Sequence, residues 1–268
     1  KEHISAPDVR VVDATWFPPF LNPEKTGRQA WAEGHIPGAV YFDIDAIKAG
    51  GTDLPHMLPD PVMFSSRARK LGLGDGNRII VYDQFNFFAS ARVWWMLRVM
   101  GQRDVKVLDG GLKAWTDAGG ETEDLPPVAV ERHFTARVRS DLLKDSDQML
   151  AASANSSHNI IDSRSAERFS GEAPEPREGL PSGHIPGSIC LPSGELRTED
   201  GRMKSAEELG KLFPNPLAPT IATCGSGVSA AVTALALARL GNWDVAVYDG
   251  SWAEWASDAS RPVATGTA

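Results

Sequence analysis

Gly34-His35-Ile36-Pro37-Gly38-Ala39 returns almost unchanged in the second half of the chain as Gly183-His184-Ile185-Pro186-Gly187-Ser188. Other segments around these two copies also match in pairs: Val11-Val12-Asp13-Ala14 with Ile160-Ile161-Asp162-Ser163, and Asp109-Gly110-Gly111-Leu112 with Asp249-Gly250-Ser251-Trp252. The period of this repeat is far too long for a solenoid. The sequence therefore predicts two copies of one domain, which suits a chain of 268 residues at roughly 150 residues per domain.

Each copy alternates short apolar runs with helical segments, a pattern typical of α/β domains with a mainly parallel sheet flanked by helices. The expected strands of the two copies are 9–12, 79–82, 105–108, 159–162, 189–191, 220–223 and 245–248. The expected helices are 89–100, 111–118, 228–240, one that begins at Ser205, and one in the segment 141–152 that is started by Asp145 or Ser146. Ser205 and Glu208 have the spacing of a capping box, in which side chains of both residues satisfy backbone N–H groups of the first turn.

The domain boundaries follow from the same repeat. We expect an N-terminal domain at 1–122, a linker at 123–139 and a C-terminal domain at 140–268. The linker region combines acidic residues, Pro126-Pro127 and little helical periodicity, which is typical of a connecting segment.

Composition excludes several classes of partner. The net charge is −8 without any basic run, which argues against nucleic acid and against an anionic membrane surface. No apolar run approaches the roughly 20 residues of a membrane span. The chain has 2 cysteines, too few for a secreted disulfide scaffold, so we expect a reducing, cytoplasmic compartment. We also expect a monomer. Because no Cys/His cluster has zinc spacing, the sequence implies no metal, and it implies no organic cofactor.

One cysteine follows an apolar run and precedes a helical segment. Thr220-Ile221-Ala222 leads into Thr223-Cys224-Gly225-Ser226-Gly227-Val228-Ser229, and the alanine-rich segment 228–240 follows. A strand, a glycine-rich turn and a helix in this order aim successive backbone N–H groups at one point, and the helix dipole favours a thiolate there. We therefore predict that Cys224 is a catalytic nucleophile. Cys190 lies inside an expected strand, and we interpret it as a small buried apolar residue.

A reactive thiolate serves several chemistries, and the loop sequence excludes some of them. Cysteine phosphatases need Cys-x5-Arg, because an arginine must bind the phosphate oxygens, but the required position here is Ala230. The local signatures of papain-like proteases and caspases are absent, which disfavours a protease.

The loop Cys224-Gly225-Ser226-Gly227-Val228-Ser229 resembles the Cys-Gly-(Ser/Thr)-Gly-Val-Thr active-site loop of the 3-mercaptopyruvate sulfurtransferases. The two Gly-His-Ile-Pro-Gly segments and Asp249-Gly250-Ser251-Trp252 resemble the tandem rhodanese domains of that family, and the resemblance covers essentially the whole chain. Ser229 departs from the usual threonine but keeps a hydroxyl group. Thiosulfate sulfurtransferases of the same fold carry Cys-Arg-Lys-Gly instead, so the neutral Gly225 and Ser226 favour mercaptopyruvate as the sulfur donor.

The resemblance implies a sulfurtransferase that moves the sulfur of 3-mercaptopyruvate, through a Cys224 persulfide, to a thiol such as thioredoxin or to cyanide, and releases pyruvate. Residue types alone leave Arg168 and Arg177 open between recognition of a carboxylate and ordinary solvated positions. Family members bind substrate with arginines in these two motifs. The implied substrate-binding set is Arg168, Arg177, Gly225, Gly227, Val228 and Ser229.

The resemblance also implies a proton relay. In the family, the histidine of the first copy is proposed to act through the loop serine, which makes His35 and Ser226 catalytic candidates beside Cys224, with Glu24 or Glu33 as the acidic partner. For His184 we expect a side chain that binds a neighbouring backbone group.

The first copy carries Asp83 where the second has Cys224, and a carboxylate cannot carry sulfur, so we expect a catalytically silent first domain. Two alternatives to the mercaptopyruvate enzyme stay open: a thiosulfate sulfurtransferase and a non-catalytic rhodanese-like binding module.

Overall fold

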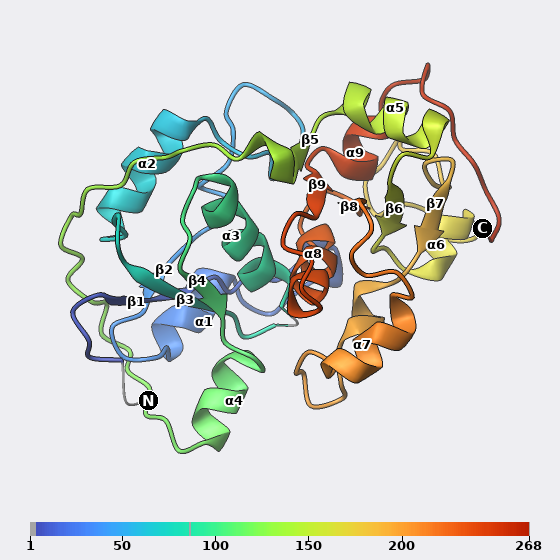
Figure 1. Cartoon of the computed structure of the whole chain (residues 1–268). Coiled ribbons are helices and arrows are strands. Elements are labelled where there is room, and N and C mark those ends of the chain that lie inside the picture. Colours follow the sequence, from blue (N-terminus) through green and yellow to red (C-terminus); the bar gives the residue numbers. More distant parts are fainter. Residues whose placement is uncertain (1–3, 86, 268) are drawn as a thin grey trace. The chain divides into compact units, whose positions relative to one another are not determined.

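The chain forms two compact units in a computed structural model that describes residues 4–85 and 87–267. The first unit comprises residues up to 50, 58–139 and 200–202, and the second comprises 51–57, 140–199 and the residues from 203 onward. In each unit a parallel sheet is flanked by helices, so the predicted fold class is confirmed (Figure 1).

The sheet of the first unit has the strand order β2-β1-β3-β4, and all its pairs are parallel. Its strands are β1 (Val9–Asp13), β2 (Val40–Tyr41), β3 (Arg78–Tyr82) and β4 (Val105–Val107). Its helices are α1 (Gly27–Glu33), α2 (Pro61–Lys70), α3 (Phe88–Val99) and α4 (Gly111–Asp117), with a 3-10 turn η1 (Pro19–Leu21). The strands are mostly buried, as expected for a parallel sheet covered by helices.

The sheet of the second unit has the order β5-β9-β8-β6-β7, again with parallel pairs. Its strands are β5 (Leu143–Lys144), β6 (Asn159–Asp162), β7 (Ser188–Cys190), β8 (Thr220–Thr223) and β9 (Ala246–Tyr248). Its helices are α5 (Ser146–Asn155), α6 (Ala166–Ser170), α7 (Ala206–Leu212), α8 (Ala230–Arg239) and α9 (Ser251–Trp255), with 3-10 turns η2 (Ser140–Leu142) and η3 (Ser193–Leu196). β8 is the central strand of this sheet, so the residue that follows it lies at the middle of the edge formed by the carboxyl ends of the strands.

Local side-chain chemistry sets where several helices begin. The predicted capping box is present, with the Ser205 hydroxyl accepting from the Glu208 N–H and the Glu208 carboxylate accepting from Ser205. α5 begins at Ser146 with Asp145 as its N-cap, as expected, and Asp145 and Gln148 form a second capping box. α2 was not predicted, although Asp60 caps it and Pro61 occupies its first position.

One core cluster of the second unit lies between its sheet and helices α5 and α9. Ile160, Ile221 and Tyr248 pack there against Met149 and Trp252. The indole N–H of Trp252 donates to the Pro181 carbonyl at 3.0 Å, so this buried ring keeps a hydrogen-bond partner. The helix that carries the Asp-Gly-Ser-Trp segment is therefore anchored to the sheet beside the end of β8.

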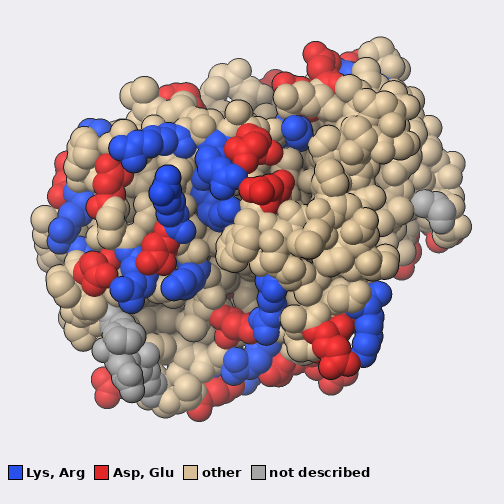
Figure 2. Space-filling model, viewed as in Figure 1, with Lys and Arg blue, Asp and Glu red and all other residues tan. Residues whose placement is uncertain are grey.

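The segment 123–139, predicted as a linker, runs along the first unit. The Phe134 ring is buried and its centroid lies 5.7 Å from that of Phe64. Arg69 donates to the Phe134 carbonyl, and α2 places three basic residues, Arg67, Arg69 and Lys70, in its last turn, where they complement the helix dipole. Basic side chains gather over this part of the first unit in Figure 2, with acidic side chains among them.

Candidate active site

Cys224 directly follows the fully buried strand β8, and only 2% of its surface is exposed. Its backbone N–H donates to the Ser251 hydroxyl at 3.1 Å, and its carbonyl accepts from the Trp252 N–H at 2.9 Å. Gly227 has a φ of 75°, a left-handed conformation that glycine adopts without a Cβ clash, and the chain then enters α8. Both ends of the loop are thus held by regular structure.

The loop after Cys224 offers several unused hydrogen-bond donors. Within the described part of the chain, no acceptor bonds the backbone N–H groups of Gly225, Ser226, Val228 or Ser229. Ser226 and Val228 are themselves buried, and buried N–H groups are normally paired. A cluster of such donors is suited to binding an anion.

The equivalent loop of the first unit contains its own anion. Asp83 follows β3 as Cys224 follows β8, and its carboxylate is buried. One carboxylate oxygen accepts from the N–H groups of Phe85 (3.2 Å) and Phe87 (3.3 Å), and the other accepts from Ser90 (2.8 Å). The donor cluster that remains unpaired in the second unit is therefore occupied by a carboxylate in the first.

Asp83 predicts a pH dependence of stability. Burial, opposed by the hydrogen bonds of Ser90 and Phe85, raises the pKa of Asp83 to about 6. The folded state therefore holds this proton more tightly than the unfolded state, and stability falls as the pH rises from about 4 through 6. Asp83→Asn lacks this titration, so its unfolding free energy should gain on the order of 2 to 3 kcal/mol relative to wild type between pH 4 and 7.

Thermal unfolding of both proteins at several pH values measures this difference. Asp124→Asn, which changes an exposed carboxylate of the same unit, serves as the control and should show no such trend. A wild-type protein that gains stability relative to Asp83→Asn as the pH rises would show that the three N–H bonds dominate instead.

Ser251 has a left-handed backbone conformation, and the equivalent residue of the first unit is a glycine, Gly111. Its φ is 50°, and Gly111 has a φ of 59° at the equivalent place. The left-handed region costs a non-glycine residue roughly 1–2 kcal/mol, which two hydrogen bonds of about 1 kcal/mol each offset: the Ser251 hydroxyl accepts from Cys224 and donates to the Tyr248 carbonyl at 2.8 Å. A Cβ at Gly111 would lie 2.2 Å from the Asp83 carbonyl oxygen, so only the unit with the cysteine accommodates the serine.

The structure brings Arg168 next to the cysteine loop. Arg168 lies on α6 and donates through Nε and Nη2 to the two oxygens of Glu175, at 3.2 and 2.5 Å. A Cβ at Gly225 would lie 3.0 Å from Nη2 of Arg168. The missing side chain of Gly225 therefore makes room for the guanidinium beside Cys224.

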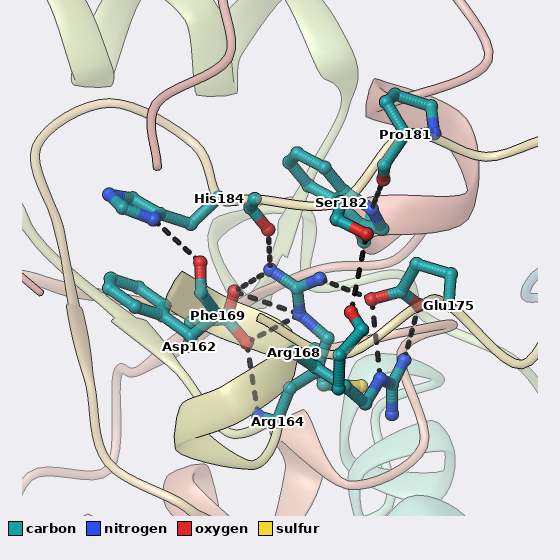
Figure 3. A network of polar contacts seen from close by, with 12 residues as sticks. Asp162, Arg164, Arg168, Phe169, Glu175, Pro181, Ser182 and His184 are labelled. Atoms are coloured by element: carbon teal, nitrogen blue, oxygen red, sulfur yellow. Dashed lines mark hydrogen bonds and ion pairs between the residues drawn. The ribbon is translucent and has the colours of Figure 1, made fainter. Parts of the chain in front are cut away.

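A buried ionic network holds Glu175, the partner of Arg168, in place (Figure 3). Arg164 donates to Glu175 at 2.7 Å, to Asp162 at 2.6 Å and to the Gly183 carbonyl at 2.8 Å, and it lies over the Trp252 ring at 4.5 Å. The Arg164, Asp162 and Glu175 side chains are each 1% exposed. Burial lowers the pKa of Arg164, but the two carboxylates outweigh it and the pKa is raised. Glu175 is thus fixed between two guanidinium groups.

Arg177 differs from the other two arginines, because it has no hydrogen bond or ion pair with any residue that the structure describes. Burial is the strongest influence on its pKa and lowers it. The negative charges of Cys224 and Glu175 act in the opposite direction, while the positive charge of Arg168 adds to the lowering. Arg177 therefore stands within electrostatic range of Cys224 with its donors unused by the described protein groups.

His35 is fully buried in the first unit. Its Nδ1 bonds the Trp31 carbonyl at 2.8 Å, and its ring stacks on that indole. Nε2 lies 3.7 Å from a Glu123 oxygen, whereas Glu33 pairs with Lys25. Ser226, its expected relay partner, belongs to the second unit, and the relay stays a prediction.

His184 repeats the geometry of His35 in the second unit. Its Nδ1 bonds the Phe169 carbonyl at 2.8 Å, and the two rings stack with centroids 3.7 Å apart. This contact with a backbone group is the structural role expected for His184.

Cys190 ends β7 and has a structural environment. Its thiol lies 3.8 Å from the Arg164 carbonyl. Burial, together with the negative charge of Asp162, raises the pKa of Cys190 to about 11, so this thiol stays protonated at neutral pH. The two cysteines of the chain thus have different surroundings, and only Cys224 is next to unpaired N–H groups.

Comparison with known proteins identifies the family. The model of the rhodanese-like domain matches residues 1–118 and again 145–258, so it recognises both units. The chain belongs to the rhodanese-like domain family.

A 3-mercaptopyruvate sulfurtransferase from Escherichia coli is 40% identical to this chain over 266 residues, and the match covers 98% of this chain and 94% of the relative. The chain is also similar to the crystal structure of SseA from Escherichia coli, which is described as a 3-mercaptopyruvate sulfotransferase of rhodanese fold. The TM-score is 0.85 at 39% sequence identity, and the match covers 94% of this chain and 95% of the SseA chain. A thiosulfate sulfurtransferase from Gallus gallus is 39% identical over 253 residues, 92% of this chain and 86% of the relative. Overall sequence identity is therefore nearly the same for a mercaptopyruvate and a thiosulfate enzyme, and it does not indicate the sulfur donor of this chain. The sequence of the loop after Cys224 is the feature that distinguishes the two.

Four further residues belong to the candidate site although their sequence context did not predict it: Asp162, Arg164, Glu175 and Ser251. A signal for Ser251 was present, because the repeat pairs it with Gly111 and so marks a difference between the units. Glu175 stands in the Pro-Glu-Pro-Arg segment that supplied Arg177, but nothing in the sequence shows which arginine it pairs with.

Among the helices that the structure describes, none is long and apolar enough to cross a bilayer.

Proposed function

We propose that this protein moves the sulfur of 3-mercaptopyruvate, through a persulfide on Cys224, to a thiol or cyanide acceptor and releases pyruvate. The observation that carries the proposal is the neutral loop after Cys224, with unpaired N–H donors and with Arg168 and Arg177 close to it. The similarity to the 3-mercaptopyruvate sulfurtransferase of Escherichia coli supports the same donor.

In the first half of the reaction, the Cys224 thiolate attacks the thiol sulfur of the substrate. An S–S bond forms, the C–S bond breaks, and its electron pair passes to C3 of the leaving group, which departs as the enolate of pyruvate. The proton of the substrate thiol balances the step when it reaches C3, leaving pyruvate and an anionic persulfide. The loop N–H groups from Gly225 to Ser229 stabilise this anion.

Arg177 and Arg168 hold the oxo acid in this scheme. Arginine binds a planar carboxylate through two parallel N–H donors. No described group of the protein accepts a hydrogen bond from Arg177, so all its donors are available to a ligand. Arg168 offers only the edge that Glu175 leaves free. Gly227, Val228 and Ser229 complete the loop around the reacting sulfur.

We assign the proton transfer to a relay from His35 through the Ser226 hydroxyl toward the departing enolate. The relay predicts that His35→Asn lowers kcat with mercaptopyruvate. His184→Asn changes the equivalent histidine of the other unit and provides a matched control. Equal effects of both variants on kcat and on thermal stability would assign His35 to structure alone.

In the second half, an acceptor thiolate attacks the outer sulfur of the persulfide and regenerates the Cys224 thiolate. With a dithiol acceptor such as thioredoxin, the second thiol then expels hydrogen sulfide and leaves a disulfide, and cyanide gives thiocyanate. We place this cycle in a reducing compartment such as the cytoplasm, because both cysteines are free thiols, and in a monomer without metal or organic cofactor.

The donor is tested by comparing kcat/KM for 3-mercaptopyruvate and for thiosulfate with cyanide as the common acceptor. The neutral Gly225 and Ser226 give no cationic side chain for a sulfonate dianion, so mercaptopyruvate should be the faster donor. A larger kcat/KM for thiosulfate would make the protein a thiosulfate sulfurtransferase. The absence of turnover with both donors would favour the non-catalytic binding module.

A further inference from the structure

The three arginines of this site, Arg164, Arg168 and Arg177, have two buried carboxylate partners, Asp162 and Glu175. Arg164 pairs with both carboxylates, and Arg168 pairs with Glu175 through two parallel hydrogen bonds. Arg177 has no carboxylate partner within the described residues. The loop residues Gly225 to Ser229 add no charged side chain. Among these five side chains the positive charge of Arg177 is therefore uncompensated, and it interacts electrostatically with Cys224.

Glu175 controls this balance because it is buried between two arginines. Its side chain is 1% exposed, so solvent screens its charge poorly. It is also one of the charges that act on Arg177. Without its negative charge, Arg168 and Arg177 would both be uncompensated, and the site would hold two free positive charges beside Cys224.

We propose that Glu175 determines donor specificity by limiting the free positive charge of the site to one. A site with a single free guanidinium fits a donor with one negative charge, such as a 2-oxo acid that carries a neutral thiol. A dianion such as thiosulfate brings a second charge that the site does not compensate, next to a thiolate that repels it. The proposal rests on the proposed function, since it names how that same site selects its donor.

Glu175 also restricts how Arg168 meets a substrate. It occupies Nε and one hydrogen of Nη2, so only Nη1 and the outer hydrogen of Nη2 stay available. That edge lies beside Gly225, because Nη2 is the atom that a Cβ at this glycine would touch. Glu175 is thus a positioning residue that acts through Arg168 and does not itself touch the reacting atoms.

Glu175→Gln keeps the shape of the side chain and removes its charge. The ratio of kcat/KM for thiosulfate to that for mercaptopyruvate should rise at least about 10-fold, because the second free guanidinium attracts the dianion more strongly than the monoanion. Glu178→Gln removes an exposed charge from the same segment and should change the ratio less than about 2-fold. An unchanged ratio in a folded Glu175→Gln protein would overturn the proposal.

A binding measurement separates this inference from the proposed function and does not depend on turnover. Protection of Cys224 from iodoacetamide is measured with pyruvate as the monoanion and sulfate as the dianion. Wild type should be protected at lower concentrations of pyruvate than of sulfate, and Glu175→Gln should gain protection by sulfate. Stronger protection of wild type by sulfate would contradict the inference, even where Glu175→Gln fails to fold. Failure of wild type to use mercaptopyruvate would contradict the proposed function alone.

Discussion

Replacing Cys224 by serine should abolish the release of pyruvate from 3-mercaptopyruvate, with a fall in kcat of at least about 1000-fold. A serine hydroxyl is far less acidic than a thiol and forms no stable bond to sulfur that could store the transferred atom. The loop donors after Cys224 stabilise an anion that already exists, but they do not create a nucleophile from an alcohol. The loss should therefore be nearly complete and should not be recovered at higher substrate concentration.

Intact mass after incubation with mercaptopyruvate measures the same event directly. Wild type should gain the mass of one sulfur atom, and Cys224→Ser should gain none. Cys190→Ser is the matched control, because its thiol lies in a strand and has a pKa raised to about 11, and it should gain sulfur as wild type does. Pyruvate release by Cys224→Ser would show that the nucleophile is another group.

Arg177→Ala should raise the KM for mercaptopyruvate roughly 10- to 100-fold, the value of a hydrogen bond between charged groups. The KM effect should be at least as large as the fall in kcat, because the proposed role of this arginine is to bind the substrate carboxylate and not the reacting sulfur. Thermal stability should change little, since removing Arg177 leaves no described carboxylate without a partner. Arg164 is the opposite case, because its loss would leave two buried carboxylates, Asp162 and Glu175, short of a cation.

Steady-state kinetics and a melting curve of the same preparation test both parts of this expectation. Lys211→Ala removes an exposed positive charge on α7 and controls for the change in net charge. If kcat and KM of Arg177→Ala equal those of wild type, Arg177 is an ordinary solvated residue. This is the alternative that the sequence alone left open.

The longer strands of this protein were predictable because parallel strands buried on both faces form continuous apolar runs, whereas the two-residue strands β2 and β5 were not predicted. The predicted strands 159–162 and 220–223 coincide with β6 and β8. Short elements gave weaker signals. α9 has five residues and begins at Ser251 in a left-handed conformation, which no propensity rule assigns to the start of a helix. The predicted helix 228–240 begins two residues later, because Val228 and Ser229 belong to the loop with unpaired donors.

The part of the site that consists of contiguous residues was predictable from the sequence. Cys224 and its glycines form one loop, so their spacing indicated an anion-binding turn. The partners of Arg168 were not predictable, because Glu175 reaches it across a turn whose shape depends on tertiary contacts. Charge patterns reveal which ions a segment contains, but the pairing of those ions, and hence the charge left for a ligand, requires the folded chain.

The carboxylate of Asp83 has a consequence for what each unit needs from outside the chain. The N–H groups of Phe85, Phe87 and Ser90 have an acceptor that is part of the chain, so these three donors are satisfied without a ligand. Under the proposed function, the N–H groups of Gly225, Ser226, Val228 and Ser229 would instead meet an acceptor whose charge and size change each time sulfur arrives and leaves. In two copies of one architecture, the hydrogen bonds of one loop would then be permanent, whereas those of the other would depend on the stage of the reaction.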